Sequence, residues 1–222
     1  MLDTSRHEKL LGKETMEKIS QTNVLVAGAG GLGSTVLQLL VRLGFSNITI
    51  VDPKIVDPPD LNRQILYTRE DLGKHKALIA KERLLSINPS CEILSIIDEI
   101  DENFNLEKNI DIVIDCFDNF ESRFILESWC EKKGIPFVHG GVEEYRAQVT
   151  VIIPGKTKSL KEIYFGITTK NKPQVFPPTV IITASLQVNE TIKLLKGDLS
   201  NALVNKILFV DILKNEYEIL SL

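Results

Sequence analysis

The stretch that decides the fold is Asn23-Val-Leu-Val-Ala27-Gly28-Ala-Gly30-Gly31-Leu-Gly33, followed by an apolar helical pattern over residues 34–43. An uninterrupted apolar run such as residues 23–27 is typical of a parallel strand buried on both faces. Glycines at the spacing of Gly28, Gly30 and Gly33 permit a tight turn, close approach of phosphate to the backbone, and close helix–strand packing. The order strand, glycine turn and helix therefore predicts a nucleotide-binding unit, although the glycines alone suit dinucleotides, flavins and other ligands.

The next predicted strand, residues 47–52, completes a strand–helix–strand unit and ends in an acid. Asp52 lies 19 residues after Gly33, close to the spacing of about 20 at which an acid hydrogen-bonds a ribose hydroxyl. Its negative charge also disfavours a nucleotide with a 2′-phosphate. The alternative interpretation is that Asp52 only caps the turn that follows the strand.

The rest of the chain alternates helical and strand patterns, which predicts one α/β domain over residues 1–222. We expect a doubly wound, Rossmann-like, mostly parallel sheet with antiparallel strands near the C-terminal end. Residues 1–20 form a predicted helical arm, and residues 154–178 a long loop of the kind that often closes or lines a binding site. The other predicted helices are 77–87, 120–133 and 179–196, and the other strands are 91–97, 110–115, 135–139, 148–153, 206–211 and 216–220.

Composition excludes several classes of protein. The 222 residues carry a formal charge of −4 and are 43% hydrophobic and 25% charged, values of a globular protein without the basic stripe that nucleic acid requires. We find no run long enough for a membrane span and no signal-peptide core at the N-terminus. Cys91, Cys116 and Cys130 are widely spaced, which indicates reduced thiols in a cytoplasmic protein.

Three cations are candidates for binding phosphate: Arg63, Lys76 and Arg42. A guanidinium matches two phosphate oxygens, whereas a lysine supplies a point charge. Arg63 follows the ribose acid along the chain and is flanked by apolar residues, which favours a site residue over a solvated surface charge.

Asp118 and Asn119 follow the predicted strand 110–115, at the sheet edge where ligands bind. A carboxylate beside a triphosphate is a natural ligand for magnesium, whereas either residue is also a good N-cap for the helix that follows. Both roles are compatible if Asn119 caps the helix and Asp118 faces the ligand. We interpret the neighbouring Cys116 as a structural thiol, and His7, His75 and His139 as structural or surface residues.

Together these residues resemble the ThiF/MoeB/HesA family of adenylyltransferases, which activate ubiquitin-like sulfur carriers, and the adenylation domains of ubiquitin-activating enzymes. The resemblance covers nearly the whole chain. Among family members, the chain resembles the compact bacterial type that serves thiamine or molybdenum-cofactor synthesis. Its motifs are far more specific than the glycines alone. They are Ser5-Arg6 ahead of Leu11-Gly12, Gly28–Gly33, Asp52, Asp60-Leu-Asn-Arg63-Gln64, Gly73-Lys-His-Lys76, Ile87-Asn-Pro89 and Asp115-Cys-Phe-Asp118-Asn119.

The resemblance implies an ATP-dependent reaction with Mg²⁺. The C-terminal carboxylate of a small carrier protein ending in Gly-Gly attacks the α-phosphate of ATP, giving an acyl adenylate and pyrophosphate. Arg63, Gln64 and Lys76 would hold and polarise the phosphates, and Asp118 would bind magnesium. Arg6 would reach the γ-phosphate in the neighbouring subunit of a homodimer. The implied nucleotide-binding residues are Gly28, Gly30, Gly31, Gly33, Asp52, Asp60, Asn62, Gln64 and Asn119.

Three departures from the family pattern modify these expectations. The family usually has Asn where this chain has Asp60, which adds negative charge beside the nucleotide unless the carboxylate binds metal or faces away. The chain has no Cys-x-x-Cys pair, so we expect no structural zinc held by four thiolates. The loop 154–178 contains no cysteine, so the reaction should stop at the adenylate or pass it to another protein's thiol.

Three other functions remain open at this level. An NAD-linked oxidoreductase is supported only by the glycine turn and Asp52. A nucleotide-binding module without turnover is kept open by Asp60. A tRNA-modifying relative that adenylates a small carboxylate is disfavoured by the acidic net charge.

Overall fold

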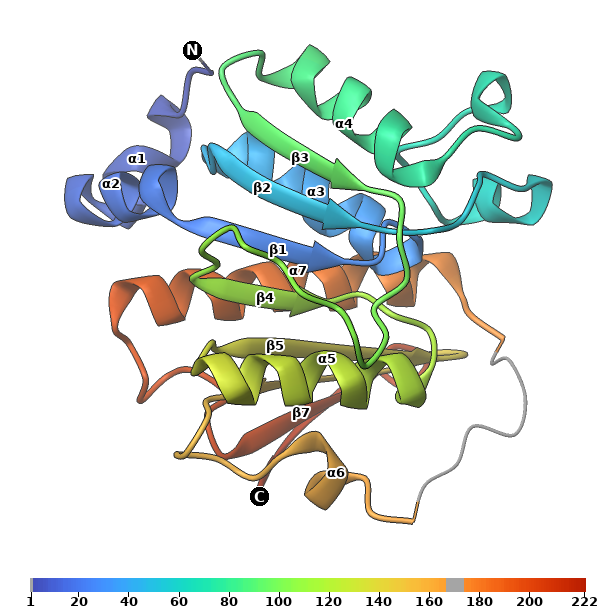
Figure 1. Ribbon diagram of the computed structural model, residues 1–222. Helices are drawn as coiled ribbons and strands as arrows, with labels where there is room; N and C mark the ends of the chain where they lie inside the picture. The colour runs from blue at the N-terminus through green and yellow to red at the C-terminus, as the bar shows by residue number, and fades with distance from the viewer. Residues whose placement is uncertain (1, 167–173) are drawn as a thin grey trace.

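A single eight-stranded sheet forms the centre of the computed structural model, which describes residues 2–166 and 174–222 (Figure 1). The strand order is β3-β2-β1-β4-β5-β6-β7-β8. The pairs from β3 to β5 are parallel and those from β5 to β8 are antiparallel, which confirms the predicted fold class. The strands are β1 Asn23–Ala27, β2 Asn47–Val51, β3 Glu92–Ile96, β4 Ile112–Asp115, β5 Phe137–Glu143, β6 Arg146–Ile152, β7 Lys206–Asp211 and β8 Glu216–Ser221.

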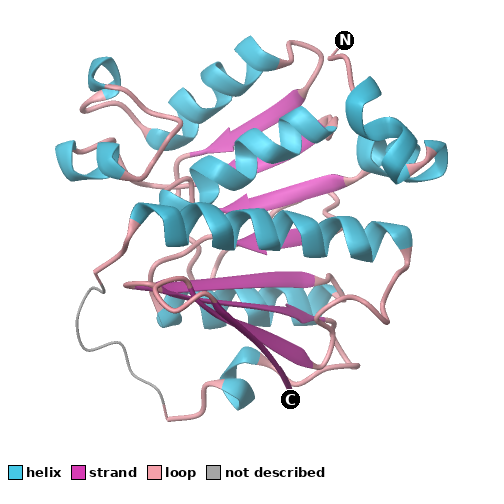
Figure 2. Ribbon diagram, turned by 180° about the vertical axis from the view of Figure 1, so that it is seen from behind, coloured by secondary structure: helices cyan, strands magenta, loops and turns pink. Residues whose placement is uncertain are grey.

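Helices cover both faces of the sheet. One face is covered by α3, α4 and α7 (Figure 2), and the opposite face by α5 and α6 (Figure 1). The helices are α1 Ser5–Leu11, α2 Lys13–Gln21, α3 Gly31–Leu43, α4 Lys76–Ile87, α5 Phe120–Lys133, α6 Leu160–Ile163 and α7 Pro177–Lys196, with the 3-10 turns η1 Pro58–Asn62 and η2 Arg69–Asp71. None of the helices in the described ranges has the length and apolarity needed to cross a bilayer.

The apolar run in β1 reflects burial on both sides. Val24 and Val26 pack into the core under α3 and α7, whereas Leu25 and Ala27 pack into the core under α5. Successive strand residues point to opposite faces, so a strand between two helical layers needs apolar residues at every position.

The boundaries of several predicted elements differ from those of the structure. The predicted helical arm of residues 1–20 is divided at Gly12, whose φ of +84° is left-handed and stops α1 before α2 begins. Helix α3 begins at Gly31 and so takes in the second half of the glycine turn. Strand β5 continues to Glu143, beyond its predicted end at residue 139, and β6 begins at Arg146, before its predicted start at residue 148. The two strands form a tight hairpin in which Glu144 adopts φ +51°.

The described part of the segment predicted as a loop over residues 154–178 contains helical structure. It contains the short helix α6, and α7 begins at Pro177, two residues before the predicted start. Proline is well suited to the first turn of a helix, because the N–H it lacks would have no helical partner there. Residues 167–173 of the predicted loop lie outside the described residues.

The strand order places a crevice between β1 and β4. From β1 the chain proceeds to β2 and β3 on one side, and it then returns to add β4 and β5 on the other. The loops after β1 and β4 therefore diverge, and ligands of open α/β sheets bind at this switch point. The glycine turn follows β1 and residues 116–119 follow β4, so the fold brings both predicted motifs to one place.

Candidate active site

A cleft of about 1670 Å³ opens at the carboxyl ends of β1, β2 and β4. Most of the residues predicted for the site line it, although they come from five separate segments of the chain. These are Gly28, Gly30, Gly31, Asp52, Asp60, Asn62, Arg63, Gln64, Lys76, Asp118 and Asn119. The predicted site residues Gly33 and Arg6 do not line the cleft, nor does the candidate cation Arg42.

The glycine turn is closely packed against its neighbours. A Cβ on Gly28 would lie 2.8 Å from the carbonyl oxygen of Cys116, and one on Gly33 would lie 1.9 Å from the carbonyl oxygen of Gly28. Gly33 therefore acts behind the cleft, by letting α3 approach the end of β1. No side chain caps α3 at its N-cap residue Gly30, and the first residues of the helix line the cleft. A helix N-terminus with uncapped N–H groups is a favourable place for an anion.

Ala29, within the glycine turn, is held by two side chains from outside it. Its N–H donates to Asp52 Oδ2 at 2.7 Å, and its carbonyl accepts from Tyr67 Oη at 2.7 Å. The other oxygen of Asp52 accepts from the N–H of Lys54 at 2.8 Å. Burial raises the pKa of Asp52, and these hydrogen bonds oppose that shift. Asp52 thus positions the glycine turn in addition to lining the cleft, a role the sequence spacing did not reveal.

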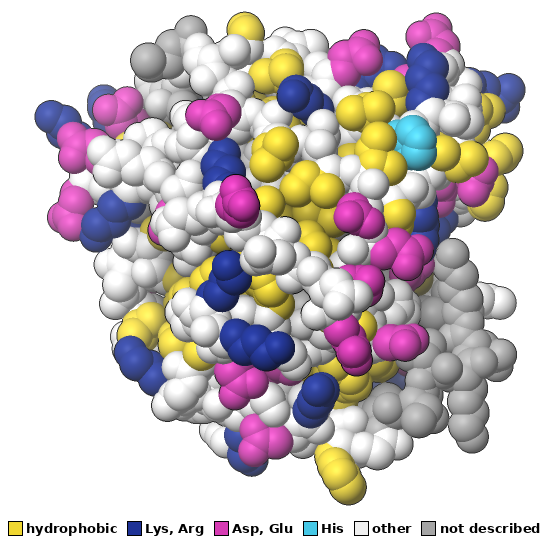
Figure 3. All heavy atoms as spheres, in the orientation of Figure 1, with side chains coloured by type: hydrophobic (Ala, Val, Ile, Leu, Met, Phe, Trp, Pro, Cys, Tyr) yellow, Lys and Arg dark blue, Asp and Glu magenta, His cyan; other side chains and the backbone are white. Residues whose placement is uncertain are grey.

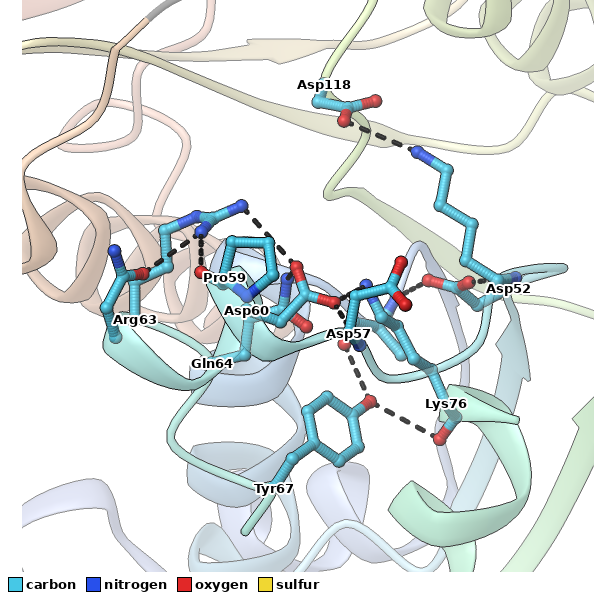
Figure 4. Close-up of polar contacts among 12 residues, drawn as sticks. Asp52, Asp57, Pro59, Asp60, Arg63, Gln64, Tyr67, Lys76 and Asp118 are labelled. Carbon is cyan, nitrogen blue, oxygen red and sulfur yellow. Dashed lines mark hydrogen bonds and ion pairs between the residues drawn. The ribbon is translucent and has the colours of Figure 1, made fainter. Parts of the chain in front are cut away.

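The carboxylate of Asp60 lies at the centre of a charged cluster on the cleft wall (Figure 4). Lys76 Nζ lies 2.8 Å from Asp60 Oδ2, and Arg63 Nη2 lies 3.6 Å from Oδ1. Gln64 Nε2 donates to Oδ1 at 2.6 Å. The side chain of Lys76 is only 5% exposed, so its charge is stabilised by Asp60 rather than by water. The carboxylate that this chain has at position 60, where the family usually has Asn, therefore faces both cations.

Arg63 is also fixed by its own turn. Its Nη1 donates to the carbonyl of Pro59 at 2.8 Å and to Asn62 Oδ1 at 3.0 Å. These contacts hold the guanidinium against η1, at the edge of the cleft. A group held in this way needs little reorganisation to meet a phosphate.

Asp118 and Asn119 take different positions after β4. Asn119 is the N-cap of α5, and its Oδ1 accepts from the N–H of Ser122 at 2.8 Å. Asp118 is 46% exposed in the cleft, with Lys54 Nζ 3.4 Å from its Oδ2. Lys54 was not predicted as a site residue, although its position two residues after Asp52 is a signal that could have indicated it.

Arg6 and Arg42 lie away from the cleft. Arg6 is an exposed residue of α1, which lies beside the ends at which the strands begin, whereas the cleft lies at their carboxyl ends (Figure 1). Arg42 is exposed in the last turn of α3, whose first turn forms the cleft. The structure therefore places Arg42 at the end of this helix that is remote from the cleft.

A buried polar network supports the floor of the cleft. Asp115 Oδ2 lies 2.7 Å from Nδ1 of the fully buried His139, and Asp115 Oδ1 accepts from the N–H of Phe117 at 3.0 Å. Arg123, which lines the cleft, donates to the carbonyls of Phe117 and Gly140 at 2.5 and 3.0 Å. Burial lowers the pKa of His139, and the Asp115 carboxylate opposes that shift. Sequence reasoning missed this network because the contacts among its members depend on how three consecutive elements, β4, α5 and β5, pack against one another.

Tyr164 and Gln187 complete the network. Tyr164 Oη lies 3.3 Å from His139 Nε2 and lines the cleft, and burial raises the pKa of the phenol. Gln187 of α7 donates to the carbonyl of Asp115 at 2.6 Å. Cys116 is buried, and burial raises the pKa of its thiol, which is unfavourable for a nucleophile.

The fit of a magnesium ion depends on the ligands available. Among residues 2–166 and 174–222 there is no group of three or more acidic, histidine or cysteine side chains that could hold a metal ion. Asp118 offers a carboxylate at the cleft wall. Mg²⁺ commonly takes one or two carboxylates and completes its shell with phosphate oxygens and water, so this donor set suits an ion that arrives with a nucleotide triphosphate.

Surface charge is mixed on one face of the molecule. On the face shown in Figure 3, acidic and basic side chains are interspersed, and no basic stripe crosses it.

A doubly wound sheet whose switch point holds a glycine turn, an open helix N-terminus and fixed cations defines a nucleotide-binding α/β protein.

Comparisons with known proteins identify the family. The chain matches the ThiF family model over residues 4–222. It is 32% identical over 196 residues to the sulfur carrier protein ThiS adenylyltransferase of Bacillus subtilis, covering 85% of this chain and 58% of that protein. The sulfur carrier protein adenylyltransferase of Thermus thermophilus is 31% identical over an alignment that covers 95% of this chain and 82% of that protein. The chain therefore belongs to the ThiF family.

A third relative shows that the match does not extend over every family member in full. The probable molybdopterin-synthase adenylyltransferase of Porphyra purpurea is 34% identical over 193 residues, which cover 83% of this chain and 50% of that protein. The chain thus spans half the length of this relative and somewhat more than half of the Bacillus protein.

Solved structures share the fold. The crystal structure of E. coli MccB with ATP superposes with a TM-score of 0.86 at 24% identity, covering 98% of this chain and 70% of that chain. MccB with succinimide gives a TM-score of 0.87 at 22% identity with the same coverage. The eight-stranded arrangement of this chain is therefore shared with that protein.

Proposed function

We propose that this protein is an ATP-dependent adenylyltransferase. Its substrate would be the C-terminal carboxylate of a small ubiquitin-like sulfur-carrier protein ending in Gly-Gly, of the thiamine or molybdenum-cofactor type. Family membership and the names of the relatives support the reaction class. The observation that carries the proposal is a single cleft that extends from the glycine turn after β1 to strands β6 and β7.

The two ends of the cleft suit two substrates. At one end lie the glycine turn and Asp52, which suit the phosphates and ribose of a nucleotide. The cleft continues past Phe117 to Gln148 of β6 and Phe209 of β7. A nucleotide fills only part of this length, and the remainder suits an extended peptide end. A flexible C-terminal tail bound there would bring its carboxylate to the phosphates.

The chemistry follows from the positions of the charges. A carboxylate oxygen of the carrier attacks the α-phosphorus of ATP, forming a P–O bond while the bond to the bridging oxygen of pyrophosphate breaks. Negative charge on the phosphates must be neutralised for two anions to approach, and Arg63 and Lys76 supply positive charge at the cleft wall. Asp118 would hold a magnesium ion bound with ATP, which neutralises further phosphate charge.

Arg6 supports a symmetric homodimer as the active form. It is exposed on α1, away from the cleft of its own chain. A second copy of the chain would let Arg6 reach the partner's cleft, as arginines supplied in trans complete some phosphoryl-transfer sites. We also propose a cytoplasmic location, which the three buried free cysteines support.

An ATP–pyrophosphate exchange assay with candidate carriers tests the proposal. Arg63→Ala should lower exchange by about 10²–10³, the usual effect of losing one electrostatic stabiliser of a transition state. Arg69→Ala is a matched control, because Arg69 lies in the neighbouring turn η2 and does not line the cleft. Equal exchange in the two variants would remove Arg63 from the mechanism.

Binding measurements separate the alternatives. Isothermal titration should show binding of ATP and no binding of NADH. Tighter binding of NADH would favour an oxidoreductase. Binding of ATP without exchange for any carrier tested would instead indicate a module without turnover.

A further inference from the structure

Asp60 makes more polar contacts than a residue that only lines a cleft would need. Its Oδ2 accepts from Lys76 Nζ at 2.8 Å and from the N–H of Asp57 at 3.1 Å, and its Oδ1 accepts from Gln64. Arg63 approaches the same oxygen. Burial would raise the pKa of this carboxyl, but the hydrogen bonds and the two cations hold it below its usual value, so Asp60 is an anion at neutral pH.

Among residues 2–166 and 174–222, the lining of the cleft carries no excess of positive charge. This described lining contains the five cations Lys54, Arg63, Lys76, Arg123 and Arg146 and the six carboxylates Asp52, Asp57, Asp60, Glu99, Asp118 and Glu143. A metal-free nucleotide triphosphate carries several negative charges, and like charges in a partly desolvated site repel strongly. The cations must therefore be shared between the protein's own acids and the phosphates.

We propose that Asp60 is a specificity-determining residue that makes the site select ATP bound to a divalent cation over metal-free ATP. This inference rests on the proposed function. The carboxylate holds Lys76 and Arg63 at the cleft wall and offsets part of their charge. A metal ion that accompanies the phosphates then supplies the missing positive charge, so nucleotide without metal binds poorly.

The contrast with a neutral side chain follows from shape and charge. An asparagine at position 60 has nearly the same volume and keeps an oxygen that can accept a hydrogen bond. It would remove the carboxylate that forms ion pairs with both Lys76 and Arg63, leaving Lys76 only the longer-range attraction of Asp52. More of the charge of both cations would then be available to the phosphates, and the dependence on metal would fall.

Titration of ATP into Asp60→Asn, with Mg²⁺ and separately with EDTA, tests this inference. We expect metal-free ATP to bind about tenfold more tightly than to wild type, the effect of one unit charge about 6 Å away at an effective dielectric constant of about 40. Binding of ATP with Mg²⁺ should change by less than about threefold, because the metal already offsets the charge. Asp60→Ser, a smaller neutral residue, should give the same change in the ratio of the two dissociation constants.

Asp71→Asn is the matched control. Asp71 is a buried acid at the same position of the next 3-10 turn, it accepts from the N–H of Thr68, and it pairs with Arg83 at 3.1 Å. It does not line the cleft, so its loss should reproduce a structural cost without altering the ratio. Thermal unfolding of each variant verifies that it is folded.

The outcomes are distinct. An unchanged ratio in Asp60→Asn and Asp60→Ser would overturn the inference. Equal weakening of both forms of ATP would also overturn it, since the carboxylate would then only hold the cations in place. Failure of the wild-type protein to bind ATP in either form would instead overturn the proposed function, and this inference with it.

Discussion

Replacement of Gly33 by alanine tests how closely α3 packs on the end of β1. The added Cβ would lie 1.9 Å from the carbonyl oxygen of Gly28, far inside ordinary contact, so the first turn of α3 would have to move away from the strand. Alanine in place of glycine gains about 1 kcal/mol of helix propensity. Overpacking typically costs about 1–3 kcal/mol and sometimes more. Because the obstacle is backbone and not a flexible side chain, we expect a net loss of about 2 kcal/mol.

Urea unfolding, combined with titration of ATP, measures this effect. The movement of α3 should also weaken binding of ATP, since the first N–H groups of the helix would no longer face the phosphates. Gly134→Ala is the control, because Gly134 caps α5 in the left-handed region with no atom within 4 Å of the added Cβ. It should cost about 1 kcal/mol from conformation alone and leave ATP binding intact. A Gly33→Ala protein as stable as Gly134→Ala would refute the argument from close packing.

Three further predictions follow from single groups. Burial raises the pKa of Glu127 from 4.5 to about 7, so the folded state holds more protons between these values and stability falls as pH rises through that window. Glu127→Gln should remove that loss, up to about 3 kcal/mol, in urea curves at pH 5 and pH 8. Asp118→Ala should raise the Mg²⁺ concentration needed for exchange and depress turnover; unchanged dependence would indicate that Asp118 has no part in metal binding. Mixing Arg6→Ala with Arg63→Ala protein should restore roughly a quarter of wild-type activity, because about half of the dimers are mixed and each has one intact site. An inactive mixture, after subunit exchange has been verified, would show that Arg6 does not act in trans.

The first half of the fold, and most of the residues that line the cleft near the glycine turn, could be predicted from the sequence. Strand β1, the glycine turn, α3 and β2 are recognisable because their pattern is local: an apolar run, a fixed glycine spacing and a helical period. Motifs after β1, β2 and β4 could be assigned to one cleft because parallel strands direct their carboxyl ends to one edge of the sheet. A residue whose role depends on its position along a strand or at a helix start could therefore be predicted from the sequence. Asn119, the N-cap of α5, is an example.

Tertiary structure decided how the charges are shared. Asp60 and Lys76 lie 16 residues apart in the chain, and only the fold of the segment between β2 and α4 brings their side chains to 2.8 Å. Likewise Asp115 and His139 come from neighbouring strands, β4 and β5, that no local pattern pairs. Periodicity specifies which face of an element is buried, but a contact between side chains depends on the distance and angle between elements. Those are set by packing of the whole chain, so Asp60 could be read as an unexplained acid in the sequence and as the partner of two cations in the structure.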